Sequence, residues 1–411
     1  MMNEQSASLP APAPMALERS AQLLAQIRAA LHAGGGWLPF DAYMQQALYA
    51  PGLGYYTGQA GQFGDFGSDS DFVTAPELSP LFGRTLAAQV AQVLQQGDLH
   101  TVVEFGAGSG RLAAQILGEL DHLGCAPRHY AIVEVSGALK HRQMQTLRSA
   151  VPHLFDRVQW WTALPETFEA VAISNEVLDA MPVKLLHRHE GGWMERGVAQ
   201  EGDDLVFADR ATALLPPAPE AHALPIGTVT EIHPQALAFV RTLADRLARG
   251  AALFIDYGFP QREYYHPQRH MGTLQAHYRH RVLDDVLLWP GLADITAHVD
   301  FTAIALAAQD AGLDVLGYTS QASFLMNCGL LDLVAAELAA GPPPVAPSSA
   351  AALCAATTAP GGSHYLRQTA AVNKLLNESE MGELFKVIAL GRGVDAHALR
   401  GFARGDRTHT L

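Results

Sequence analysis

Short apolar runs alternate with helical stretches between residues 101 and 177. The runs TVVEF, YAIVEV, VQWW and AVAISNEV are typical of strands, whereas GRLAAQILGELDHL and GALKHRQMQTLRSA carry apolar residues at helical spacing. Strands that alternate with helices pair in parallel through right-handed crossovers. The pattern therefore predicts a Rossmann-like doubly wound α/β sheet, in which ligands bind outside the carboxyl ends of the strands.

The pattern before residue 101 is helical and is interrupted by one long loop. We expect residues 1–15 to form a disordered tail. Residues 16–100 are expected to form a helical region that contains a Gly-rich loop at 52–73. A loop of this length without periodicity is typical of a lid or of disorder. After it, Thr74 and Glu77 stand in capping-box spacing around Pro76, and Ser79-Pro80 offers a second helix start.

The rest of the α/β domain, 101–411, contains two predicted interruptions. Glycine-punctuated alternating segments at about 183–233 predict an inserted β-rich subdomain with an antiparallel hairpin or meander. Residues 341–362 are of low complexity and predict a surface loop. Between the two, residues 234–250 predict a helix, and AALFIDYG predicts a buried strand that ends on Asp256.

Composition narrows the class of protein. The formal net charge is −14 with no basic block, so we expect no nucleic-acid partner. No apolar run is long enough for a membrane span. The three cysteines are scattered without metal-type spacing, which suits a reducing, cytoplasmic compartment. The sequence predicts no metal site.

The segment VVEFGAGSGRL places Gly106, Gly108 and Gly110 between a strand and a helix. Glycines at such a junction allow a tight turn and a close approach of the backbone to a ligand. Glu104 lies two residues before this loop, and Glu134 ends the next strand, where a carboxylate can accept hydrogen bonds from ribose hydroxyls. Glu104 would repel a pyrophosphate but attract an ammonium and a sulfonium, which favours S-adenosylmethionine over NAD.

Six segments resemble the MidA-like family of S-adenosylmethionine-dependent methyltransferases. They are DFVTAPELSPLFG, VVEFGAGSGRL, VEVS, NEVLDAMPV, DITAHVDF and FKVIALGRG, and they span nearly the whole folded chain. Ala75 departs from the Ser that is common before the Pro-Glu pair, and the 341–362 segment has no counterpart. Mitochondrial members are protein-arginine methyltransferases needed for the assembly of respiratory complex I. The resemblance thus implies a protein substrate such as a respiratory-complex subunit.

The resemblance also implies roles for individual residues. Glu104 and the glycines would lie at the methionine end and backbone side of the cofactor, Glu134 at its ribose, and Asn175 and Glu176 in the cleft. The predicted cofactor-binding residues are Glu104, Gly106, Ala107, Gly108, Gly110, Glu134, Val135 and Pro76.

A predicted buried strand ends on Asn175 and Glu176, with Asp179 close behind, and these three are the predicted catalytic residues. A carboxylate can bind a guanidinium bidentately, and a second carboxylate can accept the released proton. We therefore expect Glu176 to hold an arginine, with Asp179 as a second clamp or proton acceptor. The structural alternatives are that Asp179 caps a helix or turn and that Asn175 closes a backbone turn.

Other polar residues are weaker candidates. His298 and Asp300 are expected to form a hydrogen-bonded pair on one strand face, with His298 and Asp256 as substrate contacts. The His-rich segment 266–281 predicts a solvated loop, and the apolar helices between 180 and 250 offer a surface for a homodimer. Two other functions stay open: a non-catalytic assembly factor that keeps the fold, and an NAD-dependent oxidoreductase.

Overall fold

The computed structural model describes residues 9–58, 74–340 and 369–411. Residues 1–8 of the predicted tail, most of the predicted lid loop, and the low-complexity segment lie outside the described residues. The first helix begins at Pro14, inside the range predicted for the tail. The α-helices include α1 (Pro14–Ala33), α2 (Phe40–Tyr49), α3 (Ala75–Leu78), α4 (Pro80–Gly97), α5 (Arg111–His122), α6 (Gly137–Ala150), α7 (Pro234–Arg246), α8 (Gln261–Tyr264), α9 (Phe301–Asp310), α10 (Gln321–Asn327), α11 (Leu330–Ala340) and α13 (Met381–Leu384), and residues 369–376 are helical as well.

The central sheet has the strand order β15-β16-β10-β5-β2-β3-β4. Strands β4, β3, β2, β5 and β10 pair in parallel, whereas β16 runs antiparallel to both of its neighbours. This arrangement confirms the predicted Rossmann-like doubly wound class. The strands are β2 (Thr101–Phe105), β3 (His129–Val133), β4 (Val158–Trp161), β5 (Phe168–Asn175), β10 (Leu247–Phe259), β15 (Asp314–Ser320) and β16 (Phe385–Arg392), and β14 (Val299–Asp300) pairs with β10.

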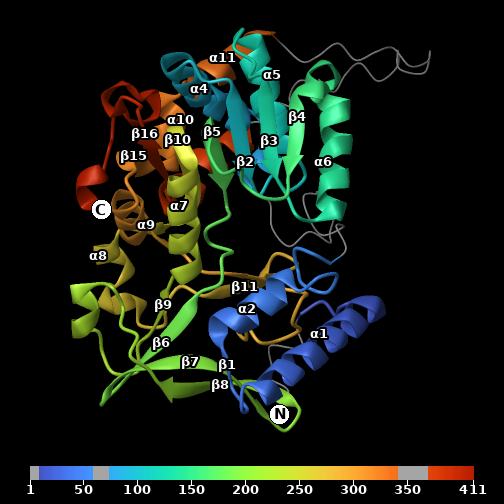
Figure 1. Ribbon diagram of the computed structural model, residues 1–411, viewed down its shortest axis with the longest axis vertical. Helices are drawn as coiled ribbons and strands as arrows, with labels where there is room; N and C mark the ends of the chain where they lie inside the picture. The colour runs from blue at the N-terminus through green and yellow to red at the C-terminus, as the bar shows by residue number, and fades with distance from the viewer. Residues whose placement is uncertain (1–8, 59–73, 341–368) are drawn as a thin grey trace, which may run out of the picture.

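Alternate residues of the strands bury into opposite faces of this sheet. Val102 belongs to the cluster formed with α4, α5 and α10, and Val103 to the cluster formed with α7 and α9. Helices therefore cover both faces (Figure 1), as a parallel sheet requires. Helix α7 ends at Arg246 and not at the predicted Gly250, because Leu247 already pairs with Phe168 of β5.

A second, antiparallel sheet confirms the predicted β-rich insertion. Its order is β1-β7-β6-β9, with β8 paired to β7. The strands are β1 (Leu38–Pro39), β6 (Lys184–His189), β7 (Gly192–Glu201), β8 (Asp204–Ala211) and β9 (Val229–Ile232).

Helices α1 and α2 lie with this second sheet, away from the helical layers of the central sheet (Figure 1). Leu23 and Ile27 of α1 and Met44 of α2 share one hydrophobic cluster with Leu185 of β6 and Val198 of β7. Helix α4, by contrast, packs into the core of the central sheet. The predicted helical region 16–100 is thus divided between the two parts of the molecule.

The His-rich segment was predicted to be a solvated loop, and this is wrong for its second half. Gln275–Tyr278 form β11, which pairs with β12 (Arg281–Leu283) and β13 (Asp294–Thr296) in a three-stranded sheet. The buried carboxylate of Glu231 accepts hydrogen bonds from the backbone N–H groups of Thr273 and Leu274, at 2.8 and 3.0 Å, and so anchors this segment.

Among the described residues, no single helix is long and apolar enough to cross a membrane. The pair Gln321–Asn327 and Leu330–Ala339 meets the length and composition criterion only when taken together, across a 59° bend.

Candidate functional site

A pocket of about 590 Å³ opens at the carboxyl ends of β2, β3 and β5, within the size range of small-molecule sites. Residues from the N-terminal helices, the central sheet and the three-stranded sheet line it together. The predicted site residues among them are Pro76, Glu104, Gly106, Ala107, Gly108, Glu134, Val135, Asn175, Glu176, Asp179 and His298. Gly110 and Asp256 do not line the pocket.

The glycine loop between β2 and α5 forms one wall of the pocket. Gly106 has φ +66°, and a Cβ there would lie 2.5 Å from Cγ2 of Val177. Gly110 has φ +85° and lies behind the wall, where a Cβ would come within 3.0 Å of Cα of Gln143. Both positions favour glycine, one for contact with the turn after β5 and the other for close packing on α6.

Glu104 is 1% exposed at the end of β2, yet it borders the pocket. The hydroxyl of Tyr130 donates a hydrogen bond to Oε2 of Glu104 at 2.5 Å. Burial raises the pKa of Glu104 to about 7, and the hydrogen bond from Tyr130 partly opposes the shift. A cationic group of a ligand beside Glu104 would favour its ionised form.

Glu134 is held from two sides at the end of β3. Its Oε1 accepts from the backbone N–H of Ser136 at 2.8 Å, and its Oε2 accepts from Nε2 of Gln143 at 3.0 Å. Val135 follows it with 79% of its surface exposed beside the pocket. The combination offers a fixed carboxylate for ribose hydroxyls next to an apolar surface for a base.

The acidic end of the pocket is the turn after β5. Glu176 has φ +53°, a left-handed conformation that is uncommon for residues other than glycine, and its N–H donates to the carbonyl oxygen of Ile255 at 2.9 Å. Nδ2 of Asn175 donates to Oε1 of Glu176 at 3.0 Å, whereas Oδ1 of Asn175 is buried without a partner in the described structure. The strained turn therefore presents both side chains to the pocket.

Asp179 lies close to Glu176 and shares its electrostatic environment. The hydroxyl of Tyr257 donates to Oδ2 of Asp179 at 2.6 Å, and Oδ1 has no hydrogen-bond partner among the described residues. Burial, followed by the charge of Asp179, raises the pKa of Glu176 to about 8. Burial also raises the pKa of Asp179 to about 6. Two adjacent carboxyl groups with raised pKa values form a site that a cation would stabilise.

Asp256 does not occupy the position predicted for a substrate contact. Its Oδ2 accepts from the backbone N–H groups of Val177, Leu178 and Asp179 at 3.2, 2.9 and 3.3 Å. The carboxyl group lies behind the turn and is 1% exposed. Asp256 therefore positions the turn that carries the acids and does not face the pocket.

His298 borders the pocket, but the predicted pair with Asp300 does not form within the described structure. Asp300 is the N-cap of α9 and accepts from the N–H of Ala303 at 3.1 Å. Among the described residues Nδ1 of His298 has no hydrogen-bond partner, and its ring contacts those of Tyr257 and Phe259, at centroid distances of 5.1 and 5.2 Å. Burial lowers the pKa of His298 to about 4, which favours a neutral imidazole.

The predicted capping box around Pro76 is also different in the structure. Thr74 makes no side-chain cap, and Oγ of Ser79 caps α4 instead, accepting from the N–H of Leu81 at 3.2 Å. Glu77 turns toward the glycine loop, where it accepts a hydrogen bond from Ser109 and forms an ion pair with Nε of Arg111 at 2.8 Å. Tertiary contacts therefore tie α3 to the loop beneath the pocket.

Several residues of the pocket were not among the predicted site residues, and three of these lie together at its acidic end. The hydroxyl of Tyr56 donates to Oδ1 of Asp294 at 2.7 Å, and Tyr49 stacks on Tyr56 at a centroid distance of 5.3 Å. All three line the pocket. The aromatic residues that flank the Gly-rich loop are the only sequence signal for the two tyrosines. They add an aromatic wall and a further carboxylate to the acidic end.

The residues present fit an S-adenosylmethionine-type cofactor. No described heavy atom lies within 4 Å of a Cβ built on Gly108, so the loop leaves open space on the pocket side. The unpartnered Oδ1 of Asn175 and the carboxyl group of Glu104 are acceptors suited to an ammonium group, and Glu134 to a ribose.

Comparisons with known proteins agree with this chemistry. A family described as "Putative S-adenosyl-L-methionine-dependent methyltransferase" matches residues 85–319. The mouse mitochondrial protein arginine methyltransferase NDUFAF7 is 32% identical over 327 residues, or 70% of each chain. The human protein of the same name is 30% identical over 323 residues, covering 70% of this chain and 69% of the human one.

Solved structures extend the likeness over almost the whole chain. A Burkholderia thailandensis protein crystallised with S-adenosyl-homocysteine is 51% identical, with a TM-score of 0.89, and the match covers 98% of this chain and 100% of that one. A native structure from the same organism gives a TM-score of 0.85 at 51% identity. The NAD-dependent alternative is thereby left without support. The chain belongs to the MidA-like family of S-adenosylmethionine-dependent methyltransferases, and S-adenosylmethionine is its cofactor.

Proposed function

We propose that this methyltransferase modifies an arginine side chain of a protein. The observation that carries the proposal is the acidic end of the pocket, where Glu176, Asp179 and Asp294 stand among Tyr49, Tyr56 and Tyr257. Carboxylates provide bidentate acceptors for a guanidinium, and aromatic faces attract its charge. The names of the mouse and human relatives support the same class of acceptor.

Four residues are assigned to the cofactor. Glu104 and Oδ1 of Asn175 would face the methionine end, Glu134 would accept the ribose hydroxyls, and Val135 would contact the base. When bound, the cofactor supplies an electrophilic methyl group on a sulfonium. The glycine loop sets how deeply the cofactor lies in the pocket, because Gly106 and Gly110 let the loop pack closely on Val177 and on Gln143.

Glu176 is assigned as the guanidinium clamp. The left-handed turn and the hydrogen bond from Asn175 aim its carboxylate into the pocket. Carboxylate contact on one edge of the guanidinium holds the positive charge away from the attacking nitrogen and orients that nitrogen toward the methyl group. Orientation of this kind supplies much of the rate in a transfer between two bound molecules.

Asp179 is assigned as the proton acceptor. When a guanidinium nitrogen gains a methyl group it must lose one proton, and Oδ1 of Asp179 is free of other hydrogen bonds in the described structure. The hydroxyl of Tyr257 stays bound to Oδ2 and fixes the orientation of the carboxyl group. A pKa of about 6 makes Asp179 a base of useful strength near neutral pH.

The proposal is tested with the purified full chain, methyl-labelled S-adenosylmethionine and a cell lysate, followed by hydrolysis of the labelled protein. We expect label in methylarginine on a discrete band, first among respiratory-complex subunits. Glu176→Gln is expected to lower transfer at least about a hundredfold with unchanged binding of S-adenosyl-homocysteine. The exposed Glu201→Gln serves as the matched control. Label in another amino acid would overturn the arginine assignment, and cofactor binding without any transfer would favour a non-catalytic assembly factor.

A further inference from the structure

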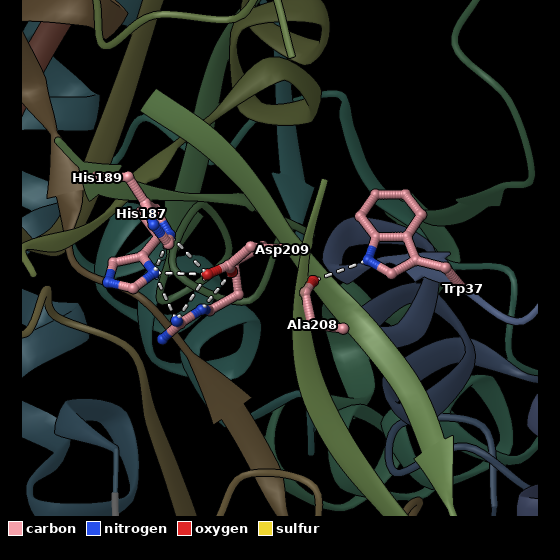
Figure 2. A network of polar contacts seen from close by, with 6 residues as sticks. Trp37, His187, His189, Ala208 and Asp209 are labelled. Atoms are coloured by element: carbon pink, nitrogen blue, oxygen red, sulfur yellow. Dashed lines mark hydrogen bonds and ion pairs between the residues drawn. The ribbon is translucent and has the colours of Figure 1, made fainter. Parts of the chain in front are cut away.

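A second cluster of chemistry-bearing side chains lies on the inserted antiparallel sheet, outside the pocket. His187 and His189 are two residues apart on β6 and therefore project from the same face of the strand. Asp209 belongs to β8, opposite Arg196 of β7, and Figure 2 shows that its carboxyl group points toward the two imidazoles. None of the four residues lines the pocket described above.

Three possible metal-ligand atoms meet at this point. Nδ1 of His187 lies 2.6 Å from Oδ2 of Asp209, and Nε2 of His189 lies 2.9 Å from both of these atoms. Among the described residues, this is the one group of three His, Cys, Asp or Glu side chains whose ligand atoms lie so close together. Two imidazoles and one carboxylate, arranged on one side, are a known ligand set for first-row transition metals with open positions for water.

Hydrogen bonding alone does not satisfy this arrangement. Nη2 of Arg196 lies 2.6 Å from Nδ1 of His187. A guanidinium only donates, so Nδ1 must present its lone pair to Arg196. The same nitrogen would need a proton to donate to Asp209, which lies at the same distance on another side. An imidazole nitrogen has one in-plane site, so Nδ1 can satisfy only one of these two contacts. A cation bound to the lone pairs of Nδ1 and of Oδ2 of Asp209 would account for their close approach.

Arg196 is compatible with a bound cation if its Nη2 atom gives up two contacts. Its Nε donates to Oδ1 of Asp209 at 2.8 Å, a bond that orients the carboxylate, and its Nη2 donates to Oδ2 at 3.1 Å. The guanidinium also lies over the ring of Phe207, at 5.6 Å from the centroid. This cation–π contact would stabilise the guanidinium after it moves away from His187. The contacts of Nη2 with Nδ1 of His187 and with Oδ2 of Asp209 have to open, whereas the hydrogen bond from Nε can stay.

We propose that His187, His189 and Asp209 bind one divalent first-row transition-metal ion of the zinc type, which ties β6 to β8 across β7. The two strands do not pair with each other, so the ion would add a direct link between them. The role is structural, because the pocket lies elsewhere. His189, with 44% of its side chain exposed, gives solvent access to the ion.

The experiment uses the full chain without an affinity tag, stripped with a chelator and titrated with Zn²⁺ or Co²⁺. We expect one equivalent to bind, a visible Co²⁺ spectrum from nitrogen and oxygen ligands, and a Tm that rises with Zn²⁺ concentration. Mg²⁺, which prefers oxygen ligands, is expected to leave Tm unchanged. His189→Ala and Asp209→Asn should each weaken binding at least about tenfold and abolish the Tm rise.

The matched control is His153→Ala, since His153 forms an ordinary exposed pair with Asp121 at 3.1 Å. It should bind Zn²⁺ as the wild type does. Equal affinity and stoichiometry in His189→Ala and in the wild type would place any bound ion elsewhere and overturn the proposal. Failure of Zn²⁺ to raise the wild-type Tm would overturn it as well. Asp209→Asn preserves the shape of the side chain and guards against a folding defect in a single variant.

Discussion

The side-chain amide of Gln143 donates a hydrogen bond to Oε2 of Glu134 at 3.0 Å, which joins the interior of α6 to the proposed ribose carboxylate. The same Nε2 atom donates to the carbonyl oxygen of Gly108 at 3.2 Å, and Oε1 accepts from Nε1 of Trp160 at 3.0 Å. Gln143 is fully buried. One side chain thus sets the position of the glycine loop relative to Glu134.

Gln143→Leu should therefore weaken cofactor binding. Loss of a hydrogen bond to a charged group is expected to raise the Kd for S-adenosyl-homocysteine about tenfold or more, measured by calorimetry. The rate at saturating cofactor should change little, because Gln143 does not border the acidic end. Gln145→Leu, an exposed position on the same helix, is the control. Equal Kd values for the two variants would contradict the positioning role.

The raised pKa of Glu176 predicts how stability depends on pH. With a pKa of about 8, the folded protein binds a proton here that the unfolded chain releases above the ordinary value of 4.5. The free energy of unfolding should therefore fall as the pH rises from 4.5 toward about 8. We expect Glu176→Gln to remove part of this fall and to raise the Tm of the ligand-free protein at the alkaline end by a few degrees, in thermal scans. The exposed Glu166→Gln should show the wild-type slope.

The same groups predict the pH dependence of methyl transfer. A cation is held by ionised carboxyl groups, and burial raises the pKa of Asp179 to about 6 and that of Glu176 to about 8. We expect kcat/KM to rise with pH across this range and to fall on acidification. Initial rates with labelled cofactor measure it. A profile that is flat from acid to alkaline pH would argue against both assigned roles.

The role of Asp256 as a hydrogen-bond acceptor predicts that its two substitutions, by Ala and by Asn, differ in Tm and in transfer rate. Asp256→Ala leaves three backbone N–H groups of the turn without their acceptor and should lower both the Tm and the transfer rate. Asp256→Asn keeps a carbonyl oxygen that can accept from them and should recover most of the Tm. Calorimetric scans and initial rates distinguish the two variants. Equal losses in both would show that the turn does not depend on this acceptor.

Tyr56→Phe tests the aromatic wall. Without its hydroxyl, Asp294 loses a 2.7 Å hydrogen bond and becomes less well oriented for a cationic substrate. We expect KM for the acceptor to rise severalfold while the Kd for S-adenosyl-homocysteine stays the same. Tyr265→Phe, outside the pocket, is the control because its hydroxyl donates a long hydrogen bond to the backbone carbonyl oxygen of Glu231, at 3.5 Å. A change in cofactor affinity alone would contradict this assignment.

The sequence predicted those parts of the site that local patterns determine. Gly106 and Gly108 follow β2, Glu134 follows β3 and Glu176 follows β5, so the parallel order brings them to one edge of the sheet. The sequence gives no sign that Gln143 contacts Glu134, because Gln143 is one of several polar residues in its helix. Only the packing of α6 brings its amide against Glu134. Tyr56 and Asp294 meet across more than two hundred residues of chain, which no spacing rule anticipates.

Predicted local pairs also failed to form where another partner competed for the same side chain. Thr74 and Glu77 have the spacing of a capping box, but Arg111 and Ser109 offer Glu77 a closer set of partners. Asp300 lies two residues from His298, but the first turn of α9 takes its carboxylate as a cap. The partners of Glu77 come from an element elsewhere in the fold, whereas Asp300 caps the helix that follows it directly.

The position of β16 has a consequence for the chain as it leaves the ribosome. This strand is made last, yet it lies between β10 and β15 and pairs with both. Until Phe385–Arg392 has emerged, β10 keeps an unpaired edge and β15 has no neighbour in the central sheet. Exposed edges of this kind invite pairing with other chains. The central sheet therefore cannot be completed until the C-terminal segment has been synthesised. A chain that terminates before β16 should aggregate, even though every residue of the glycine loop is already present.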